Sequence, residues 1–445
     1  MFYRKGEHME TISLAPNTKE SQLAQPVKSP KKAALASLLG STLEYYDFVI
    51  YGTASALLFN HLFFPQGDPV VATIGSLASF GVAYIARPIG GLVMGHVGDR
   101  ISRKTALMVT LMIMGIASIS IGLLPTYGQI GIWATVLLLI ARIAQGFSAG
   151  AEAAGASTLT MEHSPEGKRG FFTSSVMAGC SVGNVLAGLV FIPFLMLPEE
   201  HLMSWGWRVP FLLSALVLVV AYFVRTRLEE PPTEKAEKEA GAPALAVLRT
   251  QGIDVARVFF ITFFAVVQTT FNVYALAYAT NEVGIDRSFM VMVNTISLGL
   301  SIGTIPLAAW VSDRLGRKPV LLFGAITCAI TTYFYFQAIS EADLVMIFAL
   351  CLVNQGLFYA CWNGVWTIFF PEMFAAPVRY TGMAMGNQFG LIVVGFAPTI
   401  ATALFAWNGW EAVVAFVIGA IALSAAVILT TKETAFTKLE DLGKK

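Results

Sequence analysis

The chain has few charged residues for its length. Of its 445 residues only 13% are Asp, Glu, Lys or Arg, while 56% are hydrophobic. Charged residues make up about 25% of an ordinary soluble domain. This composition excludes a soluble globular protein and indicates an all-α polytopic membrane protein. The net charge is only +1, and the basic residues lie in short clusters, which argues against nucleic-acid binding.

Cysteine and catalytic motifs are also scarce. The cysteines lie in apolar runs without a Cys-x-x-Cys or histidine-rich context, so we assign them to the core and expect neither disulfides nor a metal site. The sequence has no His-Glu-x-x-His motif and no P-loop, which argues against a zinc protease and an ATP-driven pump. We therefore predict no cofactor, no metal ion and no enzymatic activity.

Apolar runs long enough to cross a bilayer recur along the chain. A spanning helix needs about 20 residues to cross about 30 Å of hydrocarbon. The sequence predicts about twelve such helices in two six-helix bundles. The predicted spans are 35–59, 70–95, 105–124, 130–161, 171–197, 210–224, 256–279, 289–311, 319–338, 344–370, 381–405 and 413–430.

One long charged segment, at 229–239, separates the sixth predicted span from the seventh. We read this segment as part of a linker between two domains. The predicted domains are a cytoplasmic tail at 1–32, a six-helix bundle at 33–226, a cytoplasmic linker at 227–253, a second bundle at 254–431 and a cytoplasmic tail at 432–445.

Positive charges gather on one side of the predicted membrane. The connections on the other side contain no Lys or Arg apart from Arg208 and Arg287. By the positive-inside rule, both termini of this multi-pass cell-membrane protein are predicted to be cytoplasmic. The first 32 residues are polar and basic, so we expect no cleavable signal peptide, and the native start is either Met1 or Met9.

The two halves of the chain repeat one another. The segment 95–104, with the sequence GHVGDRISRK, recurs as WVSDRLGRK at 310–318. The Gln-Gly pair at 145–146 in the fourth span recurs at 355–356 in the tenth. Duplicated halves of this kind are typical of transporters whose binding site lies between the halves near the middle of the bilayer.

The loop at 95–104 and the Arg-x-x-Gln-Gly segment at 142–146 resemble motifs of the major facilitator superfamily. The resemblance covers about residues 33–430, is nearest to the shikimate-permease type, and departs at Ser102, where the loop motif usually has Gly. It implies a two-bundle transporter of the metabolite:proton symporter branch, which includes shikimate, α-ketoglutarate, citrate and proline/betaine permeases. The segments that resemble this branch are 44–48, 145–152, 164–170, 205–210 and 379–382.

Two carboxylates lie inside the first predicted span. Glu44, Asp47 and Tyr51 share one helical face near the middle of the bilayer. A charge at the centre of a spanning helix costs about 2.5–3.5 kcal/mol, so such residues are functional by default. Arg142 of the fourth span lies at a similar depth. We hypothesise a proton-sensitive pair of Asp47 or Glu44 with Arg142, and the alternative is a static structural ion pair.

Glu152, further along the fourth span, has two interpretations. It either passes protons or binds a cation, or it simply pairs with Arg87 or Arg169. Arg87 itself, followed by Pro88, is predicted to be a snorkelling or gate residue rather than a ligand.

A small anionic or zwitterionic substrate needs a guanidinium or ammonium group, with amides and phenols to orient the rest. Such side chains occur at suitable depth in both halves. The alternative for many of them is a helix–helix hydrogen bond, worth about 0.6 kcal/mol. The predicted substrate-binding residues are Arg142, Gln145, Tyr51, Gln268, Asn272, Tyr278, Gln355, Trp362 and Asn363.

The repeated loops predict a cytoplasmic gate, which we call the latch. An Asp at a helix boundary can cap the N-terminus of a neighbouring helix and hold the inner faces of the halves together, and arginines then offset its charge. By resemblance, the latch governs conformational change rather than substrate choice. The alternative interpretation is that these residues have no gating role and simply follow the positive-inside rule for cytoplasmic loops. The predicted latch residues are Asp99, Arg100, Arg103, Asp313, Arg314, Arg317 and Arg379.

These features predict a proton-coupled symporter that imports a shikimate-like acid, a dicarboxylate or a betaine by alternating access. The alternatives are an uncoupled or outward-directed transporter of the same fold and a transporter-like membrane sensor. The predicted partners are the substrate, protons and the lipid bilayer, and we expect a monomer.

Overall fold

The computed structural model describes residues 29–64, 69–227 and 243–443. Within these ranges all regular elements are helical. The first half contains α1 (Pro30–Leu57), α2 (Phe59–Leu62), α3 (Pro69–Arg100), α4 (Arg103–Leu123), α5 (Tyr127–Ile130), α6 (Ile132–His163), α7 (Arg169–Thr173), α8 (Ser175–Leu195), α9 (Glu199–His201), η1 (Leu202–Gly206) and α10 (Arg208–Thr226). The second half contains α11 (Pro243–Ile261), η2 (Thr262–Ala265), α12 (Val266–Thr269), η3 (Thr270–Ala275), α13 (Leu276–Tyr278), η4 (Ala279–Val283), α14 (Arg287–Leu315), α15 (Arg317–Ser340), α16 (Leu344–Val353), η5 (Asn354–Phe358), α17 (Tyr359–Glu372), η6 (Ala376–Val378), α18 (Arg379–Gly395), α19 (Ala397–Leu429) and η7 (Leu439–Asp441).

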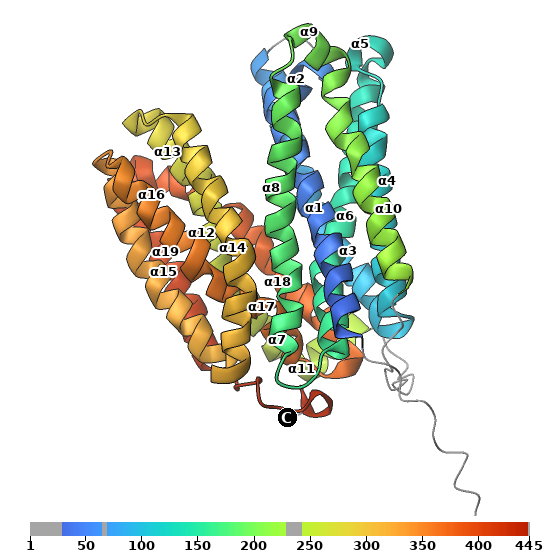
Figure 1. The fold of residues 1–445 in the computed structure, drawn as a ribbon, viewed down its shortest axis with the longest axis vertical. Helices are drawn as coiled ribbons and strands as arrows, with labels where there is room; N and C mark the ends of the chain where they lie inside the picture. Colours follow the sequence, from blue (N-terminus) through green and yellow to red (C-terminus); the bar gives the residue numbers. More distant parts are fainter. Residues whose placement is uncertain (1–28, 65–68, 228–242, 444–445) are drawn as a thin grey trace, which may run out of the picture.

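The two halves form separate helical bundles that converge at one end (Figure 1). In the first half, α3 and α4 pack against α6, and α1 packs against α8; in the second, α11 packs against α18 and α14 against α17. The halves contact each other mainly through α3 with α18 and α8 with α14. Each of these pairs joins the second long helix of one half to the fifth of the other. This arrangement confirms the predicted pseudo-symmetric halves.

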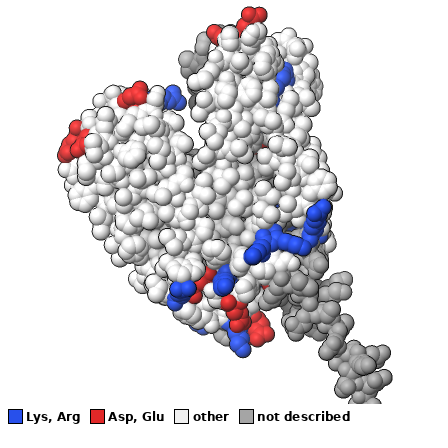
Figure 2. Space-filling model, viewed as in Figure 1, with Lys and Arg blue, Asp and Glu red and all other residues white. Residues whose placement is uncertain are grey.

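The outer surface suits a bilayer. Nine stretches of the described chain are helical, long and apolar enough to cross a membrane. Large apolar side chains such as Ile85, Leu216 and Phe223 are exposed on the outside of the bundles, and Figure 2 shows charged side chains gathered mainly at the two ends of the molecule. The long helices α1 and α3 are not among these nine stretches, although they belong to the first bundle. The last stretch includes α19, whose helical geometry is interrupted at Asn408 and Gly409. The all-α fold is confirmed, while the count of twelve spans stays a prediction.

Glycines bring α3 and α6 close together. A Cβ atom added at Gly146 or Gly150 of α6 would overlap the backbone of Ala83 or Arg87 on α3. Small residues allow such close approach between helices in a bilayer. This contact fixes the position of Arg87 relative to the polar face of α6.

The charged run at 229–239 and the tail at 1–28 lie outside the described residues. The part of the predicted linker that the structure describes is largely helical, because α11 begins at Pro243. This helix kinks at Gln251, whose φ is −133°, and the Gln251 amide bonds to the backbone of Met373, Ala375 and Gly443.

Candidate functional site

A first cluster of charged residues holds the halves together where they converge. The Asp99 carboxylate, near the end of α3, accepts hydrogen bonds of 3.2 and 2.8 Å from backbone N–H groups in the first turn of α18. Arg103 of the first half and Arg379 of the second both pair with Glu162 at the end of α6. Asp99 therefore caps a helix of the opposite half, as N-terminal carboxylates commonly do.

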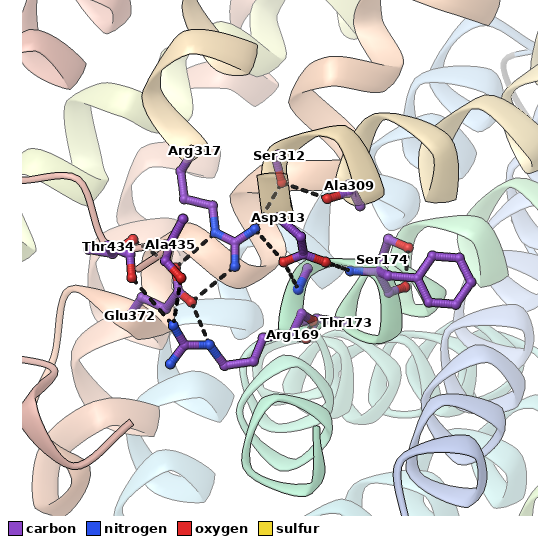
Figure 3. A network of polar contacts seen from close by, with 12 residues as sticks. Arg169, Thr173, Ser174, Ala309, Ser312, Asp313, Arg317, Glu372, Thr434 and Ala435 are labelled. Atoms are coloured by element: carbon purple, nitrogen blue, oxygen red, sulfur yellow. Dashed lines mark hydrogen bonds and ion pairs between the residues drawn. The ribbon is translucent and has the colours of Figure 1, made fainter. Parts of the chain in front are cut away.

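A second cluster repeats this arrangement with the halves exchanged (Figure 3). The Asp313 carboxylate, near the end of α14, accepts two hydrogen bonds of 2.8 Å from backbone N–H groups in the first turn of α7. Arg317 of the second half and Arg169 of the first both pair with Glu372, at 3.1 and 3.2 Å. Each cluster thus takes two carboxylates and an arginine from one half and a second arginine from the other.

The C-terminal segment reinforces the second cluster. Arg169 donates hydrogen bonds to backbone carbonyls of the segment 434–437, the shortest of them 2.8 Å long. The Glu433 carboxylate accepts hydrogen bonds of 2.8 and 3.0 Å from the first N–H groups of α15. Leu442 packs against Met161 of the first half and Ile368 of the second. The segment therefore contacts both halves at the latch end.

Two predicted latch residues lie apart from these clusters. Arg100 and Arg314 are exposed on the outside, and the Arg314 guanidinium lies 3.8 Å from the centre of the Trp310 ring. The sequence prediction missed Glu162 and Glu372. A signal was present, because each Glu stands seven positions before the arginine, Arg169 or Arg379, that begins the next segment of its half.

A small polar cavity of about 70 Å³ lies between the halves. Glu44 of α1 and Arg87 of α3 form an ion pair across it at 3.4 Å. Since only 9% of Arg87 is exposed, the snorkelling alternative predicted for it is wrong, while a gate role stays a prediction. Of the predicted substrate residues, Gln268, Trp362 and Asn363 line this cavity from the second half. We call it the central pocket. Its other polar and aromatic lining residues include Ser41, Tyr45, Thr262, Tyr359, Trp366, Asn387 and Gln388.

Asp47 lies in a different place, inside the first bundle, and is completely buried. Its carboxylate accepts a hydrogen bond from Ser118 of α4 and another, 2.6 Å long, from Ser214 of α10. Gln145 of α6 donates to Ser118 at 2.6 Å and accepts a bond of 3.0 Å from Arg142. The predicted ion pair of Arg142 with Asp47 or Glu44 is therefore wrong, because Glu44 pairs with Arg87 and Asp47 reaches Arg142 only indirectly. Ser118 and Gln145 link the two in a chain of hydrogen bonds that the sequence prediction did not include. We call this chain the Asp47 network.

Phe48 lies between the central pocket and the Asp47 network. Its ring centre is 4.4 Å from the Arg87 guanidinium carbon and 4.5 Å from that of Arg142. Arg142 also lies 4.0 Å from the centre of the Tyr51 ring, and the Tyr51 hydroxyl contacts Ser79 at 2.6 Å. These cation–π contacts offset part of the cost of burying two guanidinium groups.

Glu152 has a partner that the sequence prediction did not name. It pairs with Arg225 of α10, whereas the suggested partners Arg87 and Arg169 pair with Glu44 and Glu372. The interpretation of Glu152 as a partner of Arg87 or Arg169 is therefore wrong.

Six predicted substrate residues lie outside the lining of the central pocket. Arg142, Gln145 and Tyr51 lie in or beside the Asp47 network, and the other three lie in the second half. Tyr278 stacks on Tyr274 with ring centres 6.1 Å apart, Gln355 donates to Asn354 at 2.8 Å, and Asn272 lies in the irregular turn η3. The turns η3 and η5 are π-helical. Such turns occur often at functional sites, because they widen a helix locally and redirect its side chains.

Two helical bundles around a polar pocket, closed by paired charges at one end, define a membrane transporter. The chain belongs to the major facilitator superfamily. Residues 32–251 match the family described as "Sugar (and other) transporter", and residues 258–444 match the family described as "Major Facilitator Superfamily". Membership confirms the resemblance stated above, and the protein is a transporter rather than an enzyme.

Known relatives agree with this assignment. The chain is 35% identical over 415 residues to the shikimate transporter of Escherichia coli K12, covering 91% of this chain and 95% of the relative. It is 33% identical over 390 residues to the proline/betaine transporter of the same strain, covering 83% and 77%. Its fold is similar to that of the proton:xylose symporter XylE bound to 6-bromo-6-deoxy-D-glucose, with a TM-score of 0.79, 19% identity and coverage of 93% and 98%.

Proposed function

We propose that the chain is a proton-coupled symporter that imports a small organic acid or zwitterionic metabolite, with the latch and both termini on the cytoplasmic side. The Asp47 network is the observation that carries this proposal. A carboxylate completely buried in a membrane bundle is costly to keep charged, so a change in its surroundings can release or take up a proton. The names of the relatives support the substrate range, since they transport shikimate and proline or betaine.

Alternating access follows from the latch. Both clusters join the halves at one end, which supports a state that is closed there and takes up substrate from the opposite side. Opening the latch end requires Asp99 and Asp313 to leave the helices that they cap. The halves then turn about the central pocket, as expected for a transporter built from repeats.

Coupling assigns different roles to the buried carboxylates. Asp47 takes up a proton inside the first bundle, and the network through Ser118 and Gln145 transmits this change to Arg142. Glu44 lies in the central pocket against Arg87, where it responds to the substrate. A membrane potential of 100 mV contributes about 2.3 kcal/mol per charge moved, so one net charge per cycle sustains about 50-fold accumulation. We propose that the monomer completes this cycle.

Transport in proteoliposomes tests the proposal. The purified chain is reconstituted with an alkaline interior, and uptake of labelled shikimate and of labelled glycine betaine is measured. We expect one of them to accumulate and a protonophore to abolish its accumulation. Uptake that a protonophore leaves unchanged would indicate an uncoupled transporter. Accumulation under the opposite proton gradient would indicate an outward-directed transporter. Binding without counterflow would indicate a sensor.

A further inference from the structure

The central pocket contains buried polar atoms that lack a partner. Within the described part of the chain, Arg87 Nε and Ser41 Oγ on the first half and Asn363 Oδ1 and Gln388 Oε1 on the second have no hydrogen bond. All four residues line the pocket and are at most 9% exposed. Buried polar atoms are nearly always paired, so four unpaired ones around one cavity indicate a polar ligand.

The two sides of the pocket require opposite groups from this ligand. Arg87 Nε is a donor, so it needs an acceptor. On the other side, Gln388 Nε2 donates to the Gly150 carbonyl at 2.9 Å, which fixes the orientation of the amide and leaves its oxygen as the unpaired atom. The ligand therefore presents an acceptor towards the first half and a donor towards the second.

Charge limits the acceptor to one carboxylate. Arg87 is the one cationic side chain among the described residues that line the pocket, and Glu44 already faces it at 3.4 Å. This separation is longer than the 2.7–2.9 Å or so of a strong charge-assisted hydrogen bond. A ligand carboxylate that replaces Glu44 adds a negative charge to a neutral site. The site stays neutral only if Glu44 takes up a proton at the same time.

The surroundings of Glu44 favour this exchange. The charged groups that act on it are Arg87 of α3, Glu152 of α6 and Arg225 of α10, and the last two are paired with each other. The thiol of Cys180 on α8 and the phenol of Tyr45 on its own helix are its other titratable neighbours. Arg87 is therefore the cation that Glu44 loses when a ligand carboxylate arrives.

We infer that Arg87 binds the carboxylate of the transported substrate, that Glu44 competes with this carboxylate and is protonated when displaced, and that the substrate is a small hydroxylated monocarboxylate. The inference rests on the proposed function and narrows its substrate class. The hydroxyl groups donate to Gln388 and Asn363. A dicarboxylate places its second carboxylate against these amide oxygens, and a betaine has no N–H or O–H to donate to them.

Calorimetry on the purified full-length chain tests this inference. Shikimate, succinate and glycine betaine are titrated in two buffers with different ionisation enthalpies, which reports the protons taken up on binding. We expect shikimate to bind best and to bring one proton with it. Arg87→Gln loses charge-assisted hydrogen bonds and weakens shikimate binding about 30-fold or more. Glu44→Gln keeps the binding but loses the proton uptake.

Two exposed variants serve as controls. Arg287→Gln and Glu411→Gln make the same chemical changes at exposed positions and should bind shikimate like the wild type. Equal binding by Arg87→Gln and wild type overturns the inference, as does undiminished proton uptake by Glu44→Gln or tighter binding of succinate or betaine. If wild-type proteoliposomes still accumulate substrate when a proton gradient drives uptake in those cases, only the inference fails. If the wild type binds without translocating, the proposed function itself fails.

Discussion

The two halves share a fold but carry different chemistry in their spans. The first half buries Glu44, Asp47, Arg87, Arg142 and Glu152 within its helices. In the second half, the predicted spans between 256 and 430 contain one charged residue, Arg257, near the end of α11. The described polar side chains with which this half lines the central pocket are all uncharged, and most of them are amides. Duplication therefore preserved the latch motif but not the buried charges.

A single position illustrates this divergence. Gln145-Gly146 in α6 corresponds to Gln355-Gly356 in η5, which places Leu352 where the first half has Arg142. Burying a charge in a bilayer costs free energy. A second set of buried titratable residues in the second half would add this cost, although the first half already has a set that can bind the coupled proton. We infer that the first half provides proton coupling, while the amides of the second half orient the substrate.

The strongest test of this division is Asp47→Asn. Asparagine keeps nearly the same shape and can still accept a hydrogen bond from Ser118 or Ser214, so the bundle should fold. It cannot exchange the proton, so we expect accumulation driven by a pH gradient to be lost while counterflow continues. Uptake in proteoliposomes, with and without a gradient, measures both.

The matched control for Asp47→Asn is Glu411→Gln, which removes an exposed carboxylate from the second half and should leave accumulation unchanged. If Asp47→Asn still accumulates substrate like the wild type, Asp47 has no part in the mechanism. The assignment of proton coupling to the first half would then lose its main support.

A second test addresses what the halves have in common, the latch. The double variant Glu162→Gln and Glu372→Gln weakens both arginine bridges between the halves. Each charged hydrogen bond is worth about 1.5–3 kcal/mol, so we expect the closed latch to lose at least about tenfold in population. Spin labels at exposed positions 166 and 315 report the separation of the halves at this end.

The expected result for the double variant is a longer label-to-label distance. Labels on an otherwise unchanged chain provide the reference, and each single variant should show an intermediate shift because each cluster bridges the halves through its own glutamate. An unchanged distance distribution in the double variant would argue that the clusters do not hold the latch closed.

A third test compares two serines that bond to the same carboxylate. Ser118 links Asp47 to Gln145 and Arg142, whereas Ser214 donates to Asp47 from the other side. Ser118→Ala interrupts the network and should lower proton-driven uptake about tenfold or more, because it removes two hydrogen bonds, one to the Asp47 carboxylate and one from Gln145, each worth about 1 kcal/mol or more. Ser214→Ala leaves the connection intact and should have a smaller effect. Equal losses of uptake would show that the connection to Arg142 is irrelevant.

The sequence predicted the halves, the latch loops and the buried carboxylates, because each leaves a local signal. Charged residues inside apolar runs and repeated Asp-Arg loops are visible without a fold. The sequence did not predict that Glu44 and Asp47 lie in separate sites, since one turn of α1 faces the pocket and the next faces α4 and α10. Ser118 and Ser214 carry no signal of their own, because serine is common in spanning helices and only packing selects these two.

The smallest expected effect concerns a difference between the two latch clusters. The second cluster is supported by Glu433, which caps α15 next to Arg317. Glu433→Gln keeps one acceptor but removes the negative charge from the start of the helix, an interaction worth about 0.3–1 kcal/mol. We therefore expect only about a twofold to fivefold decrease in the closed population, measured with the same spin labels. A shift as large as that of Glu372→Gln would instead make the C-terminal segment an essential part of the latch, and the two clusters would no longer be equivalent.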